Sequence, residues 1–306
     1  GEYRITGTRG HTVDYCFEVL SGLVGDDGVV GRRIDALEAS NMHLEADGRY
    51  ELSVGGSPRP MNWLRAGNGA RTIFVRQTSN DWRTEAATPM LIERVDRPLS
   101  SASDPRPSAA AVQALFHQAA RNLVDQVRFL DTLSQQWKQT LPVNELPPPA
   151  VGPADAGYFP GQYNTKCRFV IRPDEALIVT LAPCTALYQS LALGHPLWFN
   201  SLRPRSTQST LNRAQSVPSD DGVLRYVISA QDPGVMNWLD TAGQTEGFLF
   251  LRYQRVMGAA PAQPGVQLMP LSALKAEGVS VGLRADAADR QHSLRTRRLS
   301  LDRRFF

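Results

Sequence analysis

The chain has 306 residues, of which 42% are hydrophobic and 21% charged, and its formal net charge is +3. This composition is ordinary for a globular protein and excludes a disordered or collagen-like chain, while the length predicts two domains. Seven arginines lie in residues 284–304, so the rest of the chain is close to neutral and does not have the charge of an extended nucleic-acid interface.

The first hundred residues predict a unit of short β-strands. A strand-like run opens the chain (YRITGT), and another carries Tyr15. An Asp-Gly turn at Asp47 precedes the alternating run RYELSV, and the letters MNWL follow at residues 61–64. After a Gly-containing turn comes an apolar strand that includes Arg76. Short strands separated by turn signals are typical of an antiparallel sandwich or jelly-roll-like barrel.

Residues 108–141 have a different pattern. They lack Gly and Pro, and apolar residues recur every three or four positions from Val112 to Trp137. This spacing predicts a long amphipathic helix, which Pro142 ends. We expect its apolar stripe to pack on one or both β-units. The following segment, PVNELPPPAVGP, predicts a stiff, extended linker.

The second half of the chain repeats the first. MNWL recurs at residues 236–239, although Met and Trp occur only 6 and 5 times. Both copies follow an Asp-Gly turn and an alternating strand, and both precede an apolar strand with an arginine, Arg76 or Arg252. Farther upstream the match is weaker and aligns Tyr15 with Tyr188. The chain therefore contains two related units, too few for a solenoid.

The predicted fold class is mainly β, with two related antiparallel sandwich or jelly-roll-like units joined by the long helix and the Pro-rich linker. We place the first β-unit at residues 1–100, the helical connector and linker at 101–154, the second β-unit at 155–258 and a C-terminal extension at 259–306. The extension contains a predicted basic helix over residues 284–304, whose polar residues we expect to face solvent.

Familiar catalytic motifs are missing from the sequence. GxSxG, HExxH, GxxxxGK[ST] and GxGxxG do not occur, and the five histidines show no metal-ligand spacing. Cys16, Cys167 and Cys184 form no CxxC pair, which argues against a disulfide scaffold or a zinc site and favours a reducing compartment. We therefore predict no metal, no cofactor and a cytoplasmic location.

The richest polar cluster surrounds the second MNWL. The run SAQDPGVMNWLDTAG places Asp232 and Asp240 beside Asn237 and Trp238. Clustered carboxylates at a strand end can form an acid–base pair. In the alternative, Asp232 caps its own turn, the repeated Asn bonds loop backbone and the Trp closes the sandwich. We favour structure for the repeated Asn-Trp-Leu and function for the aspartates, because Asp240 is replaced by Arg65 in the first copy.

Two other segments carry candidate residues. One follows the first apolar strand and contains Asp81, Trp82 and Glu85. These residues are candidates for ligand binding, and the alternative is that they form a surface salt network. The other, HPLWFNSLRPRSTQSTLNR, mixes aromatic and hydrogen-bonding side chains that suit a sugar, with a packed crossover as the alternative. The candidate catalytic residues are Asp232, Asp240 and Arg252. The candidate substrate-binding residues are Tyr188, Trp198, Asn200, Arg203, Asn212, Asn237, Trp238, Arg76, Asp81, Trp82 and Glu85.

The runs DPGVMNWLDTAG, GARTIFVRQ and GFLFLRYQ resemble bacterial proteins of the domain-of-unknown-function family numbered 1214, which the related family numbered 1254 often accompanies. The resemblance covers roughly residues 1–275. It implies β-sandwich, jelly-roll-like domains with intervening helices, and it carries over no catalytic assignment. Many members look longer at the N-terminus, so we expect this chain to be trimmed.

These observations predict an enzyme or a ligand-binding protein for an oxygenated small molecule, held in a cleft of the β-units. If it is an enzyme, we expect cofactor-free acid–base chemistry of a lyase, isomerase or hydrolase, with Asp232 or Asp240 as base and Arg252 or Arg203 stabilising an anion. The alternative is a non-catalytic carbohydrate-binding or assembly module that uses the helix and the basic tail. We expect a small-molecule partner, no nucleic acid and no membrane span, and leave open a homo-oligomer.

Overall fold

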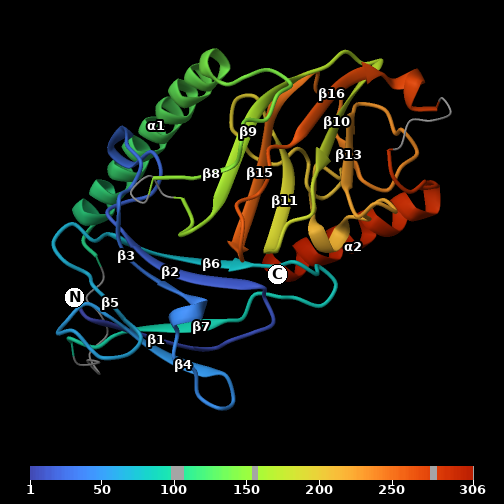
Figure 1. Cartoon of the computed structure of the whole chain (residues 1–306). Coiled ribbons are helices and arrows are strands. Elements are labelled where there is room, and N and C mark those ends of the chain that lie inside the picture. The colour runs from blue at the N-terminus through green and yellow to red at the C-terminus, as the bar shows by residue number, and fades with distance from the viewer. Residues whose placement is uncertain (98–106, 154–157, 276–280, 306) are drawn as a thin grey trace. The chain divides into compact units, whose positions relative to one another are not determined.

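The computed structural model describes residues 1–97, 107–153, 158–275 and 281–305 (Figure 1). The fold is mainly β, with a long helix α1 (Ala109–Thr140) and a C-terminal helix α2 (Ala287–Phe305), as predicted. The chain forms two compact units. Unit 1 comprises Gly1–Thr78, Ala87–Leu133 and Pro153–Tyr158, and unit 2 comprises Ser79–Ala86, Ser134–Gly152 and Phe159–Phe306. The predicted boundaries after residues 100 and 154 lie outside the described residues.

Unit 1 contains a four-stranded sheet in the order β5-β4-β1-β7 and a three-stranded sheet in the order β3-β2-β6. One core cluster draws on both sheets, with Tyr15 and Phe17 from β2 and Leu52 from β4. Burial alternates over residues 49–52 of β4, with the two-residue period of a strand that has one face on a core, and the last two residues of the strand are both buried. The strands are β1 (Tyr3–Thr8), β2 (Asp14–Leu20), β3 (Arg33–Glu38), β4 (Arg49–Val54), β5 (Trp63–Leu64), β6 (Thr72–Thr78) and β7 (Met90–Arg94).

Unit 2 repeats these two sheets and enlarges one of them. Its orders are β14-β13-β10-β16 and β12-β11-β15-β9-β8, so β9 and β8 are additions. Leu177 of β10, Leu191 of β11 and Leu249 of β15 share its core. The strands are β8 (Ala150–Val151), β9 (Tyr163–Val170), β10 (Glu175–Leu181), β11 (Ala186–Gly194), β12 (Thr210–Asn212), β13 (Leu224–Ser229), β14 (Trp238–Asp240), β15 (Glu246–Val256) and β16 (Gly265–Pro270).

Strand pairing at the two MNWL corners follows the same pattern in both units. In unit 1, β5 runs parallel to β4, with Trp63 opposite Ser53. In unit 2, β14 runs parallel to β13, with Trp238 opposite Val227. Every other pairing between named strands is antiparallel. The second unit also extends past its predicted end at residue 258, because β16 pairs with β10.

The strand register corrects the sequence alignment by one residue. The two repeated arginines are equivalent, since Arg76 lies opposite Cys16 and Arg252 lies opposite Ser190. The residue before Cys16 is Tyr15, and the residue before Ser190 is Gln189 rather than Tyr188. A shift of one position along a strand moves a side chain to the other face of the sheet. Gln189, and not Tyr188, is therefore the structural counterpart of the core residue Tyr15.

The long helix departs from expectation over its N-terminal half. Leu115, Phe116 and Leu123 are 63%, 72% and 62% exposed, so the apolar stripe does not pack along its whole length. The last turns do pack, because the ring of Trp137 lies 4.5 Å from that of Phe199 in unit 2. Within the described residues, neither this helix nor any other is long and apolar enough to cross a membrane.

Candidate functional site

Asn237 fixes the second MNWL corner through three hydrogen bonds from a side chain that is only 2% exposed. Its Oδ1 accepts from the Val217 N–H at 2.8 Å, and its Nδ2 donates to the carbonyl oxygens of Val217 at 2.7 Å and Arg225 at 3.1 Å. Asn62 makes the same three bonds in unit 1, at 2.8, 2.8 and 3.0 Å. The repeated asparagine satisfies loop backbone, which supports its structural interpretation.

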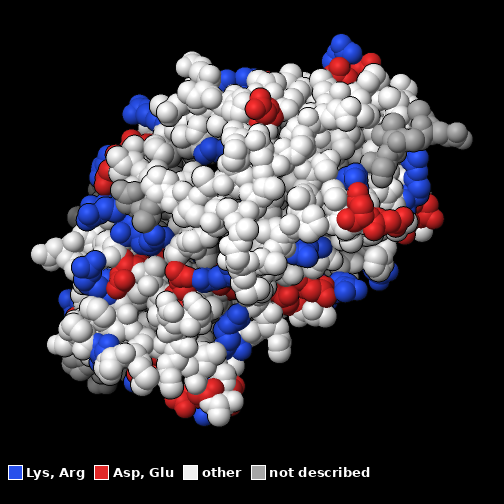
Figure 2. Space-filling model, in the orientation of Figure 1, with Lys and Arg blue, Asp and Glu red and all other residues white. Residues whose placement is uncertain are grey.

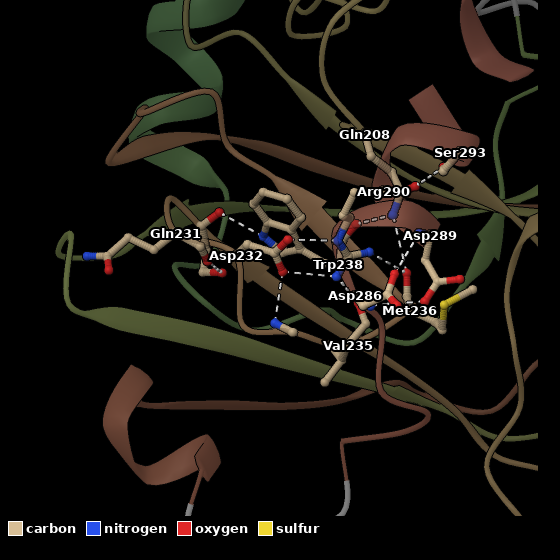
Figure 3. A network of polar contacts seen from close by, with 12 residues as sticks. Gln208, Gln231, Asp232, Val235, Met236, Trp238, Asp286, Asp289, Arg290 and Ser293 are labelled. Atoms are coloured by element: carbon tan, nitrogen blue, oxygen red, sulfur yellow. Dashed lines mark hydrogen bonds and ion pairs between the residues drawn. The ribbon is translucent and has the colours of Figure 1, made fainter. Parts of the chain in front are cut away.

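Asp232, the first predicted catalytic carboxylate, is engaged by α2 (Figure 3). Arg290 of this helix donates from Nε and Nη2 to the two carboxylate oxygens at 2.8 and 3.0 Å, and its guanidinium lies 5.1 Å from the centre of the Trp238 ring. Burial raises the pKa of Asp232, but the bonds from Arg290 and the Gly234 N–H outweigh it and hold the pKa below the usual value. Asp232 is therefore a charged anchor for α2.

Asp240 has the opposite electrostatic behaviour. Burial raises the pKa of its carboxyl group above the usual value, against the lowering effect of the hydrogen bond from the Ala242 N–H. That bond, at 2.7 Å to Oδ1, caps the turn after β14. The charge of Asp232 also raises the pKa and that of Arg203 lowers it. Asp240 is thus the better suited of the two aspartates to hold a proton.

Helix α2 docks on unit 2 mainly through polar side chains (Figure 3). In Figure 1 it is the red helix at the lower ends of β11 and β13. Ser293 donates to the side-chain oxygen of Gln208, whose Nε2 donates to the carbonyl of Trp238 at 2.6 Å. Arg297 is 3% exposed, donates to the Thr210 carbonyl and lies 4.8 Å from the ring centre of Trp82.

Burial lowers the pKa of Arg297 to about 10. The helix was expected to present its polar residues to solvent, and the structure corrects this expectation for Arg290 and Arg297. Both guanidinium groups lie against tryptophan rings, which attract cations and cover the apolar part of the arginine side chain.

The segment Ser79–Ala86 follows β6 of unit 1 but belongs to unit 2. Asn212 Nδ2 donates to the Asn80 carbonyl at 2.8 Å. Glu85 accepts from the N–H groups of Asn80 and Asp81 at 2.9 and 3.0 Å, so it shapes the loop. The hydrogen bond from the Arg83 side chain lowers the pKa of Asp81. Four predicted residues (Asp81, Trp82, Glu85 and Asn212) thus lie in one unit.

Other predicted residues are placed elsewhere. Arg76 donates from Nε to the buried Glu18 at 2.7 Å in unit 1. Arg252 is exposed on β15, with its guanidinium 5.4 Å from the Phe250 ring centre, and β15 is in a different sheet from β14, which carries Asp240. In the segment between β11 and β12, Trp198, Asn200 and Arg203 are exposed. Tyr188 is half-buried on β11.

A cavity of about 600 Å³ lies close to the second corner, within unit 2. We call it the polar hollow. The side chains of Ser219, Asp220, Asp221 and Arg284 line it together with apolar residues, among them Val281. The sequence interpretation missed these residues because they lie in two irregular segments far apart in the chain. Their only sequence signal is that Asp221 belongs to the Asp-Gly turn before β13.

The described part of the chain contains no cluster of three or more His, Cys, Asp or Glu side chains that could hold a metal ion. The three cysteines are free thiols. Burial raises the pKa of Cys16 to about 12 and that of Cys167 to about 12, so neither is an activated nucleophile.

Comparison with known proteins finds structural neighbours, and the more similar of the two described here is uncharacterised. An uncharacterised protein from Burkholderia cenocepacia has a similar crystal structure, with a TM-score of 0.78 and 28% identity over 89% of this chain and 74% of that chain. The VPA0106 protein from Vibrio parahaemolyticus also matches, with a TM-score of 0.43 and 10% identity over 88% of this chain and 85% of that chain. No family model matches the chain, and no curated protein does.

Proposed function

We propose that the protein binds a small oxygenated organic molecule in the polar hollow of unit 2. The observation that carries this proposal is a cavity of about 600 Å³ that combines a guanidinium, carboxylates and apolar walls. This volume is within the range of small-molecule pockets. The Ser219 hydroxyl is buried without a hydrogen-bond partner. A sugar or polyol could pair its hydroxyl groups with Ser219, Asp220 and Arg284 and place its C–H faces on Val281.

The second MNWL corner holds part of the wall of this binding site in place. Asn237 holds both backbone groups of Val217, which is itself a wall residue of the hollow. Asp221, another wall residue, receives two bonds from Arg225 at 2.9 and 2.6 Å, and these bonds lower the pKa of Asp221 to about 2. Hydrogen bonds thus hold two of the wall residues, Val217 and Asp221, in place, and a preorganised site loses less entropy on binding.

A titration of glucose, xylose and myo-inositol against the whole protein, followed by calorimetry and thermal shift, tests this function. We expect at least one of them to bind, and Arg284→Ala to weaken that binding about tenfold, because a hydrogen bond from a charged group is lost. Arg172→Ala removes another exposed arginine, one outside the hollow, and should leave binding unchanged. Equal loss in both variants would contradict the assignment.

Catalysis is the second candidate, carried by the raised pKa of Asp240. The proposed chemistry is metal-independent and cofactor-free acid–base work with Asp240 as the proton-holding group. Asp232 fits this role less well, since Arg290 occupies both of its oxygens. Asp240 does not line the polar hollow, so Asp240→Asn should abolish any turnover while leaving sugar binding in the hollow in place. Unchanged turnover in a folded variant would remove Asp240 from the mechanism.

Self-association through α1 is the assembly candidate, with a second copy of the chain as the partner. Five apolar side chains of α1 are exposed, namely Leu115, Phe116, Leu123, Val124 and Val127. Exposed apolar side chains that gather on one element often mark a protein–protein contact. Phe116→Glu should shift the sedimentation coefficient to that of a monomer if this helix forms a homo-oligomer.

We do not expect a nucleic acid as a partner. Figure 2 shows acidic residues close to basic ones on the face that it presents, whereas a nucleic-acid interface is a surface with an excess of basic residues.

We also propose a fold, a family and a location for the protein. We propose that the two sheets of each unit pack as a sandwich, because the largest core cluster of each unit takes residues from both of its sheets. Membership of the family numbered 1214 is proposed from the run between Asp232 and Gly243. A cytoplasmic location is proposed from the three free thiols, since oxidising compartments favour paired cysteines.

A further inference from the structure

Unit 2 contains a second cavity, of about 300 Å³, which is lined in part by the connection between β12 and β13. We call it the amide cavity. Most of its wall is apolar, from residues such as Ala182, Pro183 and Leu224, and the polar lining residues are Gln189, Arg213 and Ser216. It shares Pro218 with the polar hollow but is otherwise lined by different residues. The two cavities therefore differ in size and in chemistry.

The side-chain amide of Gln189 is the polar group of this cavity that lacks a hydrogen-bond partner. Its side chain is 2% exposed, and its Nε2 has no hydrogen-bond partner. Ser216, on the same wall, is satisfied, because its Oγ donates to the Asn212 carbonyl at 2.7 Å and lies 2.9 Å from the Tyr226 hydroxyl. Buried polar groups are almost always paired. The unpaired amide thus marks a position where an acceptor oxygen belongs.

In unit 1 the same position is filled by side chains of the protein itself. The counterpart of Gln189 is Tyr15, which is fully buried and whose hydroxyl lies 2.8 Å from that of Tyr50. The corner register makes Tyr50 the counterpart of Leu224, because Ser53 and Val227 both lie opposite the corner tryptophan. Two bonded tyrosines in unit 1 are thus replaced by glutamine and leucine in unit 2. Both replacements line the amide cavity.

We propose that the amide cavity binds a neutral, compact and largely apolar molecule that offers one carbonyl or hydroxyl oxygen to Gln189. Arg213 also lines the cavity, but its Nη1 donates to the Cys184 carbonyl at 2.6 Å. The remaining, largely apolar wall disfavours a charged ligand. The volume is at the lower end of ligand pockets, which limits the molecule to a single ring or a short chain. This ligand class differs from the polyhydroxylated molecule proposed for the polar hollow, so the two sites can be tested separately.

Cyclohexanone is a suitable probe, and methylenecyclohexane matches its shape without the acceptor oxygen. Saturation-transfer NMR and a titration should show that cyclohexanone binds the wild-type protein. Gln189→Tyr should abolish binding by filling the cavity as Tyr15 does in unit 1. Gln189→Leu retains most of the space but removes the donor, so it should weaken cyclohexanone binding about fivefold, the effect of one neutral hydrogen bond. Methylenecyclohexane should bind the Leu variant at least as well as the wild type.

Arg284→Ala, a change in the polar hollow, is the matched control and should leave cyclohexanone binding unchanged. A wild-type protein that does not bind cyclohexanone overturns the proposal, since the cavity then holds water alone. Equal binding by Gln189→Tyr overturns it as well, because the ligand would then bind elsewhere. If circular dichroism shows that the Tyr variant is unfolded, the Leu variant decides, and an unchanged affinity for cyclohexanone in that variant overturns the role of the amide.

Discussion

The two units share their corners and differ in what surrounds them. Asn62 and Asn237 make the same three hydrogen bonds, and both corner tryptophans donate to a backbone carbonyl, at 2.9 and 3.2 Å. The equivalent core positions, in contrast, hold Tyr15 in one unit and Gln189 in the other. The comparison indicates that shared residues maintain the architecture, and that divergent positions are where a cavity could form in only one copy.

The largest difference should come from the two equivalent arginines. Arg76 bonds Glu18, whose side chain is fully buried, whereas Arg252 is exposed on its strand. Removing Arg76 leaves the buried Glu18 with Arg33, at 3.4 Å, as a weaker partner, so Arg76→Ala should cost about 3 kcal/mol of unfolding free energy, at the lower end for a broken buried pair. Arg252→Ala should cost less than about 1 kcal/mol. Urea denaturation followed by circular dichroism measures both, and equal losses would contradict the comparison.

The core position that distinguishes the units predicts the next largest effect. Tyr15→Gln removes a buried ring and its hydroxyl bond to Tyr50, and should destabilise the protein by about 3 kcal/mol. The reciprocal change, Gln189→Tyr, enters an existing cavity and should alter the unfolding free energy by about 1 kcal/mol or less in either direction. Urea midpoints measure the pair. A Tyr variant that loses as much stability as the Gln variant would show that the cavity cannot accept a ring.

Strong local signals explain which parts of the fold could be predicted. The helix α1 was predicted within one residue at each end because it lacks Gly and Pro over its length and Pro142 follows it. The duplication was found because Met and Trp are rare and occur together twice. The exposure of Phe116 could not be predicted, since periodicity shows that a helix has an apolar face and not what covers that face.

The site depended on long-range contacts that no local pattern contains. The sequence marked Asp232 and Asp240 but could not show that Arg290, from a helix 58 residues away in sequence, would bind the first. Gln189 was overlooked because its neighbour Tyr188 gave a better match of residue type to Tyr15. Strand register, and not residue identity, decides which side chain enters the core, and register became visible only when Arg76 and Arg252 were placed opposite their partners.

The corner asparagines themselves should differ by a smaller amount. Asn237 is 2% exposed, and Asn237→Ala should cost about 2 kcal/mol because it leaves the Val217 and Arg225 backbone groups without their partner. Asn62 is half-buried, so water can replace its bonds, and Asn62→Ala should cost about 1 kcal/mol. Urea denaturation checks the order. A larger loss at Asn62 would show that solvent does not reach the first corner.

The smallest predicted effect concerns pH, and it tests a position where Asp232 replaces Ser57 of the first unit. The pKa of Asp232 in the folded protein is below its ordinary value of 3.8, so its contribution to stability is present above that pH and is lost as pH falls through the lower, folded-state pKa. Since the carboxylate is 40% exposed and solvent screens the pair, Asp232→Asn should cost less than about 1 kcal/mol at neutral pH.

Unfolding free energies of the wild type and Asp232→Asn, measured from neutral pH down to acid, should therefore converge below pH 3.8. Asp240→Asn is the control with the opposite sign. Its folded pKa is raised, so the wild-type carboxylate is a cost above that raised pKa, and the cost disappears as pH falls towards 3.8. A gap between wild type and Asp232→Asn that stays constant into acid would mean that the lost stability does not depend on the charge of the carboxylate. Helix α2 would then be docked by its other contacts rather than by this charge.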